Sequence, residues 1–271
     1  MAYLDDTKPL KLGDIAKLRS GGEKIAMLTC YDASFAAMLD RCGVDVVLVG
    51  DSLGNVIQGH ATTLPVKLED MVYHTQCVFA GMKRAFLIAD MPFGSYQESP
   101  QQALHNAAKL MAAGAQMVKI EGGAYMAETV RFLTERGIPV CAHIGLTPQS
   151  VHQLGGYRVQ GKGETAAGVM LSDALALEQA GAAMMIIEMT PTETATRITQ
   201  AMKTTATIGI GAGPHCDGQV LVLYDMIGVF PGKRPRFVKN FIPDTGTIEG
   251  AVKAYVTEVK SGAFPAPEHG Y

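Results

Sequence analysis

Four short apolar runs in this sequence each end on an acidic residue, at Asp51, Asp90, Glu121 and Glu188. Each run has the apolar content of a strand that is buried on both faces. An ionised acid is costly to remove from water unless a positive charge accompanies it. We therefore expect these acids to share a cation or to carry out chemistry, rather than to stabilise a core.

A divalent metal ion is the cation that this set of side chains favours. Carboxylates that meet at one place repel each other unless a cation is present, and oxygen ligands without convergent His or Cys suit Mg²⁺ better than Zn²⁺. We expect Asp51, Asp90 and Glu121 to be the metal ligands. The alternative is that each acid caps a helix or pairs with a basic residue. It explains the group less well, because a proline-containing loop follows Asp90.

Lys119 lies two residues before Glu121, so the two side chains share one face of a strand. The amine could sit beside a substrate carboxylate, form a Schiff base as in metal-independent aldolases, or only neutralise the acids. His143 also ends an apolar run, where it could orient a substrate oxygen or satisfy a buried hydrogen bond. The other histidines have no metal-ligand spacing and are expected to be structural or exposed: His60, His74, His105, His152, His215 and His269.

The length, composition and net charge of the chain limit the classes of function that these residues could serve. The chain has 271 residues, of which 48% are hydrophobic, enough for a large core in one domain. A net charge of -3 and a pI near 6.2 give no reason to expect nucleic acid or an anionic membrane as a partner. No apolar run approaches the ~20 residues that cross a bilayer, and the first residues lack signal-peptide features, so we expect a cytoplasmic protein.

The chain has five cysteines and no C-x-x-C pair. We expect these cysteines to be reduced and mostly buried.

Strands and helices alternate along the chain. Apolar runs predict strands at 24–29, 46–49, 85–90, 115–121, 137–143, 183–188, 207–211 and about 220–226. Amphipathic stretches predict helices at about 10–18, 32–40, 65–78, 101–113, 126–136, 164–180 and 248–259, and another after residue 190. Helix starts are marked by Asp32, by Ser99-Pro100, and by Thr190-Pro191-Thr-Glu193, a capping box with proline at the first helical position.

Eight such strands with helices between them predict a (β/α)8 TIM barrel, in a chain close to the ~250 residues typical of that fold. We expect one domain over residues 1–271, with an N-terminal helical extension. A doubly wound open sheet is the alternative, because periodicity does not show whether a sheet closes. In a barrel the strand-end residues Asp51, Asp90, Glu121, His143 and Glu188 would all lie on the active face.

Two glycine-rich segments have separate interpretations. Residues 154–163 contain four glycines and little apolar content, which is typical of a mobile lid over the strand ends. Gly209, Gly211 and Gly213 alternate with other residues and lack the G-x-G-x-x-G spacing of a nucleotide loop. We interpret them as baring one face of a strand, which would leave room for a ligand inside the barrel.

Several longer motifs occur together and in order. They are Val49-Gly-Asp51-Ser52-Leu-Gly54, Gln58-Gly-His60 with Thr63-Leu-Pro65, Ala89-Asp90-Met-Pro92-Phe93, Val118-Lys119-Ile-Glu121-Gly-Gly123, His143-Ile-Gly145-Leu-Thr-Pro-Gln-Ser150, Gly155-Gly-Tyr157-Arg-Val-Gln160-Gly, and Ile208-Gly-Ile-Gly-Ala-Gly213 with Asp217-Gly-Gln219. From about Ile25 to Val259 the chain closely resembles the ketopantoate hydroxymethyltransferase family. Only the first nine residues and the tail after Ser261 carry no family signal.

The resemblance implies a barrel of the phosphoenolpyruvate/pyruvate type that binds Mg²⁺. It implies transfer of a one-carbon unit from 5,10-methylenetetrahydrofolate to 3-methyl-2-oxobutanoate, giving 2-dehydropantoate for pantothenate biosynthesis. By the same resemblance Asp51, Asp90 and Glu121 are metal ligands, and Asp51, Ser52, Asp90 and Lys119 surround the keto acid. Glu188 is the implied proton acceptor, acting on a substrate whose enolate Mg²⁺ stabilises. The family also implies a homo-oligomer, typically a decamer.

Two other functions stay open at this stage. One is a different metal-dependent carbon-carbon lyase, or a class II aldolase, acting on a 2-oxo acid on the same barrel. Activity without the folate donor would favour it. The other is a barrel that only binds metabolites, which proton exchange from the keto acid would exclude.

Overall fold

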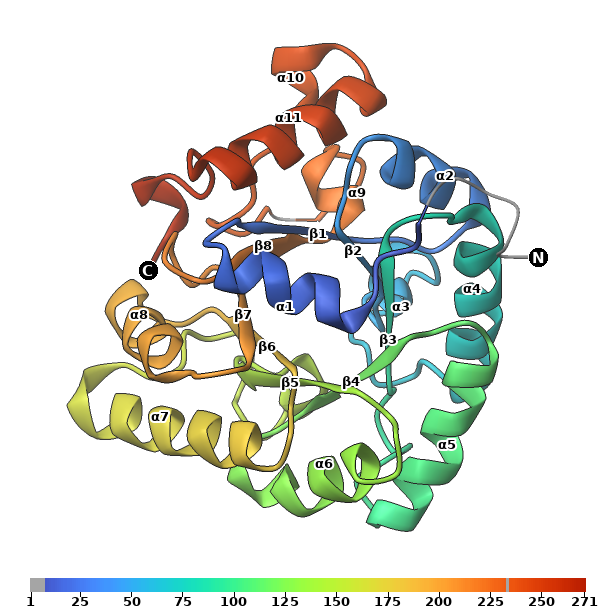
Figure 1. The fold of residues 1–271 in the computed structure, drawn as a ribbon. Helices are drawn as coiled ribbons and strands as arrows, with labels where there is room; N and C mark the ends of the chain where they lie inside the picture. Colours follow the sequence, from blue (N-terminus) through green and yellow to red (C-terminus); the bar gives the residue numbers. More distant parts are fainter. Residues whose placement is uncertain (1–7, 233) are drawn as a thin grey trace.

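Eight parallel strands pair in sequence order and close into a barrel (Figure 1). The computed structural model describes residues 8–232 and 234–271. The strands are β1 Ile25–Thr29, β2 Val46–Val49, β3 Phe86–Asp90, β4 Met117–Glu121, β5 Val140–Gly145, β6 Met184–Glu188, β7 Ala206–Ile210 and β8 Gly218–Leu221. Closure comes from pairing of β1 with β8, where Met27 lies beside Val220. The predicted (β/α)8 barrel is therefore confirmed, and the open sheet is excluded.

The described residues form eleven α-helices, most of which lie around the outside of the barrel (Figure 1). They are α1 Leu12–Ser20, α2 Ala33–Arg41, α3 Leu53–Val56, α4 Leu68–Gly81, α5 Pro100–Ala112, α6 Ala127–Thr134, α7 Gly163–Gln179, α8 Thr192–Ala201, α9 Leu223–Met226, α10 Ile242–Thr245 and α11 Ile248–Ser261, with short 3-10 turns η1 Ala124–Met126, η2 Pro148–Ser150 and η3 Pro267–His269. The strands are almost completely buried because helices pack on one face and side chains fill the barrel on the other. This explains why the strands appear in the sequence as continuous apolar runs.

Two predicted helix starts are confirmed. The Asp32 carboxylate accepts hydrogen bonds from the first backbone N–H groups of α2, and Ser99 caps α5 with Pro100 at its first position. The predicted capping box of α8 is wrong. Pro191 is the residue before the helix, and the Thr190 hydroxyl donates instead to the Glu188 carbonyl at 3.0 Å. The Thr190 hydroxyl therefore bonds to a carbonyl at the end of β6 and does not cap the helix.

The predicted eighth strand is too long. It ends at Leu221, and residues that we assigned to it form helix α9. The three alternating glycines also do not form one bare strand face as predicted, because β7 ends at Ile210, and Gly211 and Gly213 follow it with positive φ angles. A Cβ atom at Gly209 would lie 3.0 Å from Gln219, and one at Gly211 would lie 2.9 Å from Phe237. The missing side chains make room for neighbouring protein atoms, not for a ligand.

Helix α1 lies across the barrel on the side away from the strand ends that carry the acids (Figure 1). The Arg19 guanidinium donates to the carbonyl groups of Met202 at 2.7 Å and Lys203 at 2.8 Å, and to the Asp217 carboxylate at 3.1 Å. These contacts attach α1 to the turns before β7 and β8. In the part of the chain that the structure describes, no helix has both the length and the apolar composition needed to span a bilayer.

The cysteine prediction is confirmed. All five cysteines are free thiols, and every one except Cys77 is buried. Burial raises the pKa of Cys30 and Cys141 to about 12, so these thiols stay protonated and unreactive at neutral pH. They are core residues.

Candidate active site

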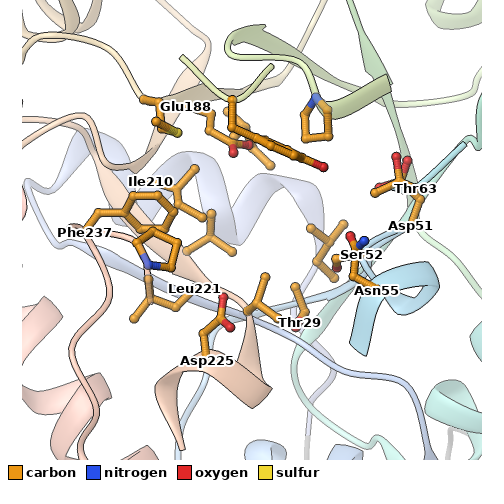
Figure 2. A pocket seen from close by; sticks show the side chains of 18 of the residues that line it. Thr29, Asp51, Ser52, Asn55, Thr63, Glu188, Ile210, Leu221, Asp225 and Phe237 are labelled. Carbon is orange, nitrogen blue, oxygen red and sulfur yellow. The ribbon is translucent and has the colours of Figure 1, made fainter. Parts of the chain in front are cut away.

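A cavity of about 810 Å³ opens at the carboxyl ends of the strands, and Figure 2 shows part of its lining. Every residue to which we assigned a site role contributes to its wall: Asp51, Ser52, Asp90, Lys119, Glu121, His143 and Glu188. They come from the ends of β2 to β6, or from the residues that directly follow. Because parallel strands all end on the same side of a barrel, residues far apart in sequence share one cavity.

Lys119 lies at the centre of the acidic cluster. Its Nζ atom is 3.1 Å from Asp90 Oδ1 and 3.4 Å from Glu121 Oε1, and all three side chains are buried. Asp90 is the direct neighbour of Lys119 in the pairing of β3 with β4, while Glu121 shares its strand face. Burial by itself lowers the pKa of Lys119, but the surrounding acids outweigh it and raise the pKa well above the usual value. The predicted shared face of Lys119 and Glu121 is confirmed.

His143 joins two of the acids. It pairs with Glu121 across β4 and β5, and its Nδ1 atom is 3.3 Å from Glu121 Oε1. On its other side, Nε2 is 3.2 Å from Glu188 Oε2. Burial and Lys119 lower the pKa of His143, but the opposing effect of Glu121 and Glu188 is larger, and the net result is a rise from 6.5 to about 9. The imidazole is therefore positively charged at neutral pH and attracts the Glu188 carboxylate, although its Nε2 atom forms no well-aligned hydrogen bond with any described residue.

Asp51 is positioned by a residue for which we predicted no role. Its Oδ2 atom accepts a hydrogen bond of 2.9 Å from Gln149 Nε2, while its own N–H donates to Asp90 at 3.0 Å. The backbone N–H of Gln149 also donates to Glu121 Oε2 at 2.9 Å. Tyr96 completes the network, since its hydroxyl donates to Gln149 Oε1 at 2.7 Å and accepts the Glu121 N–H at 3.0 Å. Gln149 thus connects two of the expected metal ligands.

The signal for Gln149 was present in the sequence but could not be interpreted there. The residue lies within the motif His143 to Ser150, in the turn η2 that follows β5. Nothing in that motif indicates a contact with Asp51, which is 98 positions away. Only the closed barrel brings the two together.

The three expected metal ligands differ in their pKa values. Burial, followed by the charges of Asp90 and Glu121, raises the pKa of Asp51 to about 8. Burial also raises the pKa of Asp90, although Lys119 opposes this. For Glu121 burial is outweighed by Lys119 and His143, which lower its pKa to about 2. Without a metal ion, the cluster therefore keeps a proton on Asp51 near neutral pH.

The cluster fits a hard divalent cation in its donor atoms and in its charge. It offers buried carboxylate oxygens, and Asp90 Oδ1 accepts no well-formed hydrogen bond from any described residue, although Lys119 lies near it. Within residues 8–232 and 234–271, however, no three His, Cys, Asp or Glu side chains are already spaced as a metal site. The expected ligands are close together, and they must rearrange to surround an ion.

Two further parts of the cavity wall correspond to sequence expectations. Ser52 directly follows Asp51, and its hydroxyl lies 2.8 Å from the hydroxyl of Tyr31. In the glycine-rich segment expected to be a lid, Tyr157 lines the cavity and is 50% exposed. The Gln160 N–H of that segment donates to the Met189 carbonyl at 2.9 Å, directly after β6. The segment therefore lies beside Glu188, while its mobility stays a prediction.

A closed (β/α)8 barrel with buried acids, a lysine and a histidine at its strand ends defines a barrel enzyme that acts on a small molecule. The model of the ketopantoate hydroxymethyltransferase family matches residues 9–267. A protein from Azoarcus sp. (strain BH72) with the name 3-methyl-2-oxobutanoate hydroxymethyltransferase is 68% identical over 271 residues, which cover all of both chains. The chain belongs to the ketopantoate hydroxymethyltransferase family. These matches do not favour a different lyase or aldolase.

Solved structures with a similar fold come from another group of barrel enzymes. A phosphonopyruvate hydrolase in complex with oxalate and Mg²⁺ aligns with a TM-score of 0.62 at 12% identity, over 96% of this chain and 93% of that one. A 2,3-dimethylmalate lyase of the PEP mutase/isocitrate lyase superfamily aligns with a TM-score of 0.58 at 16% identity, over 80% and 82%. At this identity the similarity concerns the fold alone, and it agrees with the expected barrel type.

Proposed function

We propose that this protein transfers a hydroxymethyl group to 3-methyl-2-oxobutanoate, giving 2-dehydropantoate for pantothenate biosynthesis. The carbon comes from 5,10-methylenetetrahydrofolate, water supplies the hydroxyl oxygen, and tetrahydrofolate is released. The observation that carries the proposal is the position of the Glu188 carboxylate. Its Oε2 atom lies 3.2 Å from His143 Nε2, and both side chains line the same cavity as Lys119 and the buried acids. The name of the 68% identical relative supports the choice of substrate.

The first chemical step is removal of the proton at C3 of the keto acid. This proton lies next to a ketone and is too weakly acidic for a carboxylate base, unless the developing negative charge is stabilised. Asp51, Asp90 and Glu121 would hold Mg²⁺, which acts as a Lewis acid on the substrate oxygens and orients them. The phosphonopyruvate hydrolase of similar fold holds Mg²⁺ with oxalate, a ligand of comparable oxygen chemistry.

The side chains of this chain perform the remaining tasks. Glu188 accepts the C3 proton, while the charged His143 fixes its carboxylate in position. Lys119 offsets the substrate carboxylate, and Ser52 lies at the same wall as a hydrogen-bond donor. The enolate carbon then bonds to the methylene carbon of the folate iminium as the carbon–nitrogen π bond breaks. Water next bonds to that carbon as the remaining carbon–nitrogen bond breaks, so the carbon keeps the hydroxyl group and the nitrogen takes the proton and leaves as tetrahydrofolate. Tyr157 and its glycine-rich segment exclude bulk water from the enolate, so that only the water that supplies the hydroxyl group reacts.

Replacing Glu188 by glutamine tests the role of this base. The variant should bind the keto acid and Mg²⁺ normally but lose exchange of the C3 proton in D₂O, measured by NMR. Glu193→Gln is the matched control, because this exposed glutamate on α8 lies outside the cavity. It should exchange at the rate of the unmodified protein. Exchange at the normal rate in Glu188→Gln would show that another group is the base.

Two reagents separate the metal route from a Schiff base on Lys119. EDTA should abolish turnover, and borohydride added with the keto acid should leave Lys119 unlabelled. Trapping of the substrate on Lys119, or turnover without the folate donor, would instead support an aldolase-type reaction.

We also propose that the protein is a cytoplasmic homo-oligomer, a decamer by its resemblance to the family. Sedimentation equilibrium of the purified protein measures the assembly directly. A monomeric mass over the micromolar range would contradict this part of the proposal.

A further inference from the structure

The cavity is larger than the keto acid requires. Its volume of about 810 Å³ is typical of pockets for drug-sized ligands, whereas the acidic cluster surrounds only a small part of it. A large apolar part of the remaining wall comes from the C-terminal part of the chain: Ile210, Leu221, Val222, Pro235, Phe237 and Tyr271. A second ligand with a flat apolar body therefore has room beside the acids.

One acid stands apart from the cluster, on this second part of the wall. Asp225 lies on the short helix α9, and Figure 2 shows its carboxylate pointing into the cavity between Leu221 and Thr29, across from Glu188. Among residues 8–232 and 234–271, no group donates a hydrogen bond to this carboxylate and no basic side chain forms an ion pair with it. Burial raises its pKa to about 6, although Arg234 opposes the shift.

A carboxylate in such a place requires a partner. It is partly desolvated and receives no compensating hydrogen bond from the described protein, which is unfavourable in the free state. A carboxylate accepts two parallel N–H bonds from a group that carries two adjacent donors. A planar heterocycle with an amino group beside a ring N–H meets this requirement, and its ring can pack on the apolar wall.

The rim of the cavity carries two arginine side chains, which add a second requirement for the ligand. Arg234 and Arg236 line it and are exposed. Arg236 is already held in place, because its Nε atom donates to the Glu268 carbonyl at 2.8 Å and its guanidinium lies 5.8 Å from the Tyr271 ring. Two guanidinium groups at the mouth favour a ligand with carboxylates at the end opposite the heterocycle.

We propose that Asp225 binds the 2-amino-4-oxopyrimidine edge of the reduced folate donor through two parallel hydrogen bonds, while Arg234 and Arg236 face the glutamate carboxylates of that donor. This inference rests on the proposed function, from which the identity of the second substrate is taken. It places the folate ring on the wall formed by β7, β8 and α9, across the cavity from Glu188. The methylene carbon then lies between the two ligands, where the new bond forms.

The experiment compares Asp225→Asn with the unmodified protein. Asparagine has nearly the same shape as aspartate, but its amide places an N–H group opposite an N–H group of the ligand, so one of the two hydrogen bonds is lost. The KM for 5,10-methylenetetrahydrofolate should therefore rise by about 10- to 100-fold. The Kd for tetrahydrofolate, measured by calorimetry, should rise by a similar factor. Asp244→Asn is the matched control, because this exposed aspartate on α10 lies outside the cavity. Both variants should fold, since the Asp225 carboxylate is unfavourably buried in the free protein.

A partial reaction separates this inference from the proposed function. Exchange of the C3 proton of the keto acid requires Glu188 but no folate, so Asp225→Asn should exchange at a near-normal rate. A normal KM and Kd for folates in Asp225→Asn, with folate-dependent turnover in the unmodified protein, would overturn the role of Asp225 alone. Loss of proton exchange in Asp225→Asn would also overturn the proposed role of Asp225, because the substitution would then disturb the keto acid site and not only the folate site. If the unmodified protein shows no folate-dependent turnover, the proposed function itself fails.

Discussion

Asp51→Asn should stabilise the metal-free protein at neutral and alkaline pH. Burial and the neighbouring acids raise the pKa of Asp51 from 3.8 to about 8. Because the pKa of the folded protein is the higher one, this group contributes its full stability below about pH 4 and loses it as the pH rises toward 8. Asparagine carries no proton to lose, and its carbonyl oxygen can still accept the hydrogen bond from Gln149.

The expected size follows from the pKa shift. Each pH unit between the two pKa values corresponds to about 1.4 kcal/mol, so the complete effect has an upper bound of about 6 kcal/mol. Between pH 5 and pH 8 the free energy of unfolding of Asp51→Asn should gain about 4 kcal/mol relative to the unmodified protein. Asp90 and Glu121 interact with Asp51, so the difference between the two proteins reports the titration of Asp51 together with its effect on these two acids.

The assay is urea denaturation followed by far-UV circular dichroism, in EDTA, at one protein concentration and several pH values. Asp244→Asn serves as the exposed control and should follow the unmodified protein. Adding Mg²⁺ should then stabilise the unmodified protein more at pH 8 than at pH 6, because the ion displaces a proton from Asp51. Parallel stability curves for Asp51→Asn and the unmodified protein in EDTA would refute the reasoning.

Two further substitutions test the positioning network and the core. Gln149→Leu removes the side-chain donor to Asp51 and should weaken Mg²⁺ binding by about 10- to 100-fold in calorimetry, and unchanged affinity would contradict its positioning role. Tyr255→Phe removes a hydroxyl that lies 2.9 Å from the carbonyl oxygens of Met27 and Gln219. It should lower the free energy of unfolding by about 1 kcal/mol with turnover retained, and an unchanged urea midpoint would exclude this contribution.

The errors at the ends of elements have a common cause. The sequence of the eighth strand stays apolar beyond Leu221, yet the chain turns there into α9, and this turn carries Asp225 to the cavity. Thr190 has the sequence of a helix cap, but its hydroxyl bonds to the carbonyl of Glu188. Two of the three alternating glycines, Gly211 and Gly213, follow β7 and do not belong to it. In each case the outcome depends on a hydrogen bond or a packing partner that local sequence does not contain.

The sequence by itself determined the order of the strands and helices and the acids at the strand ends. A strand buried on both faces must be a continuous apolar run, so a carboxylate at its end is visible without any structure. The motifs around Asp51, Lys119 and His143 also indicated the family. Only the tertiary structure decided that the sheet closes, that Gln149 reaches Asp51, and that Asp225 faces the same cavity. Periodicity reports whether a side chain is buried, whereas its partner is fixed by the path of the chain through space.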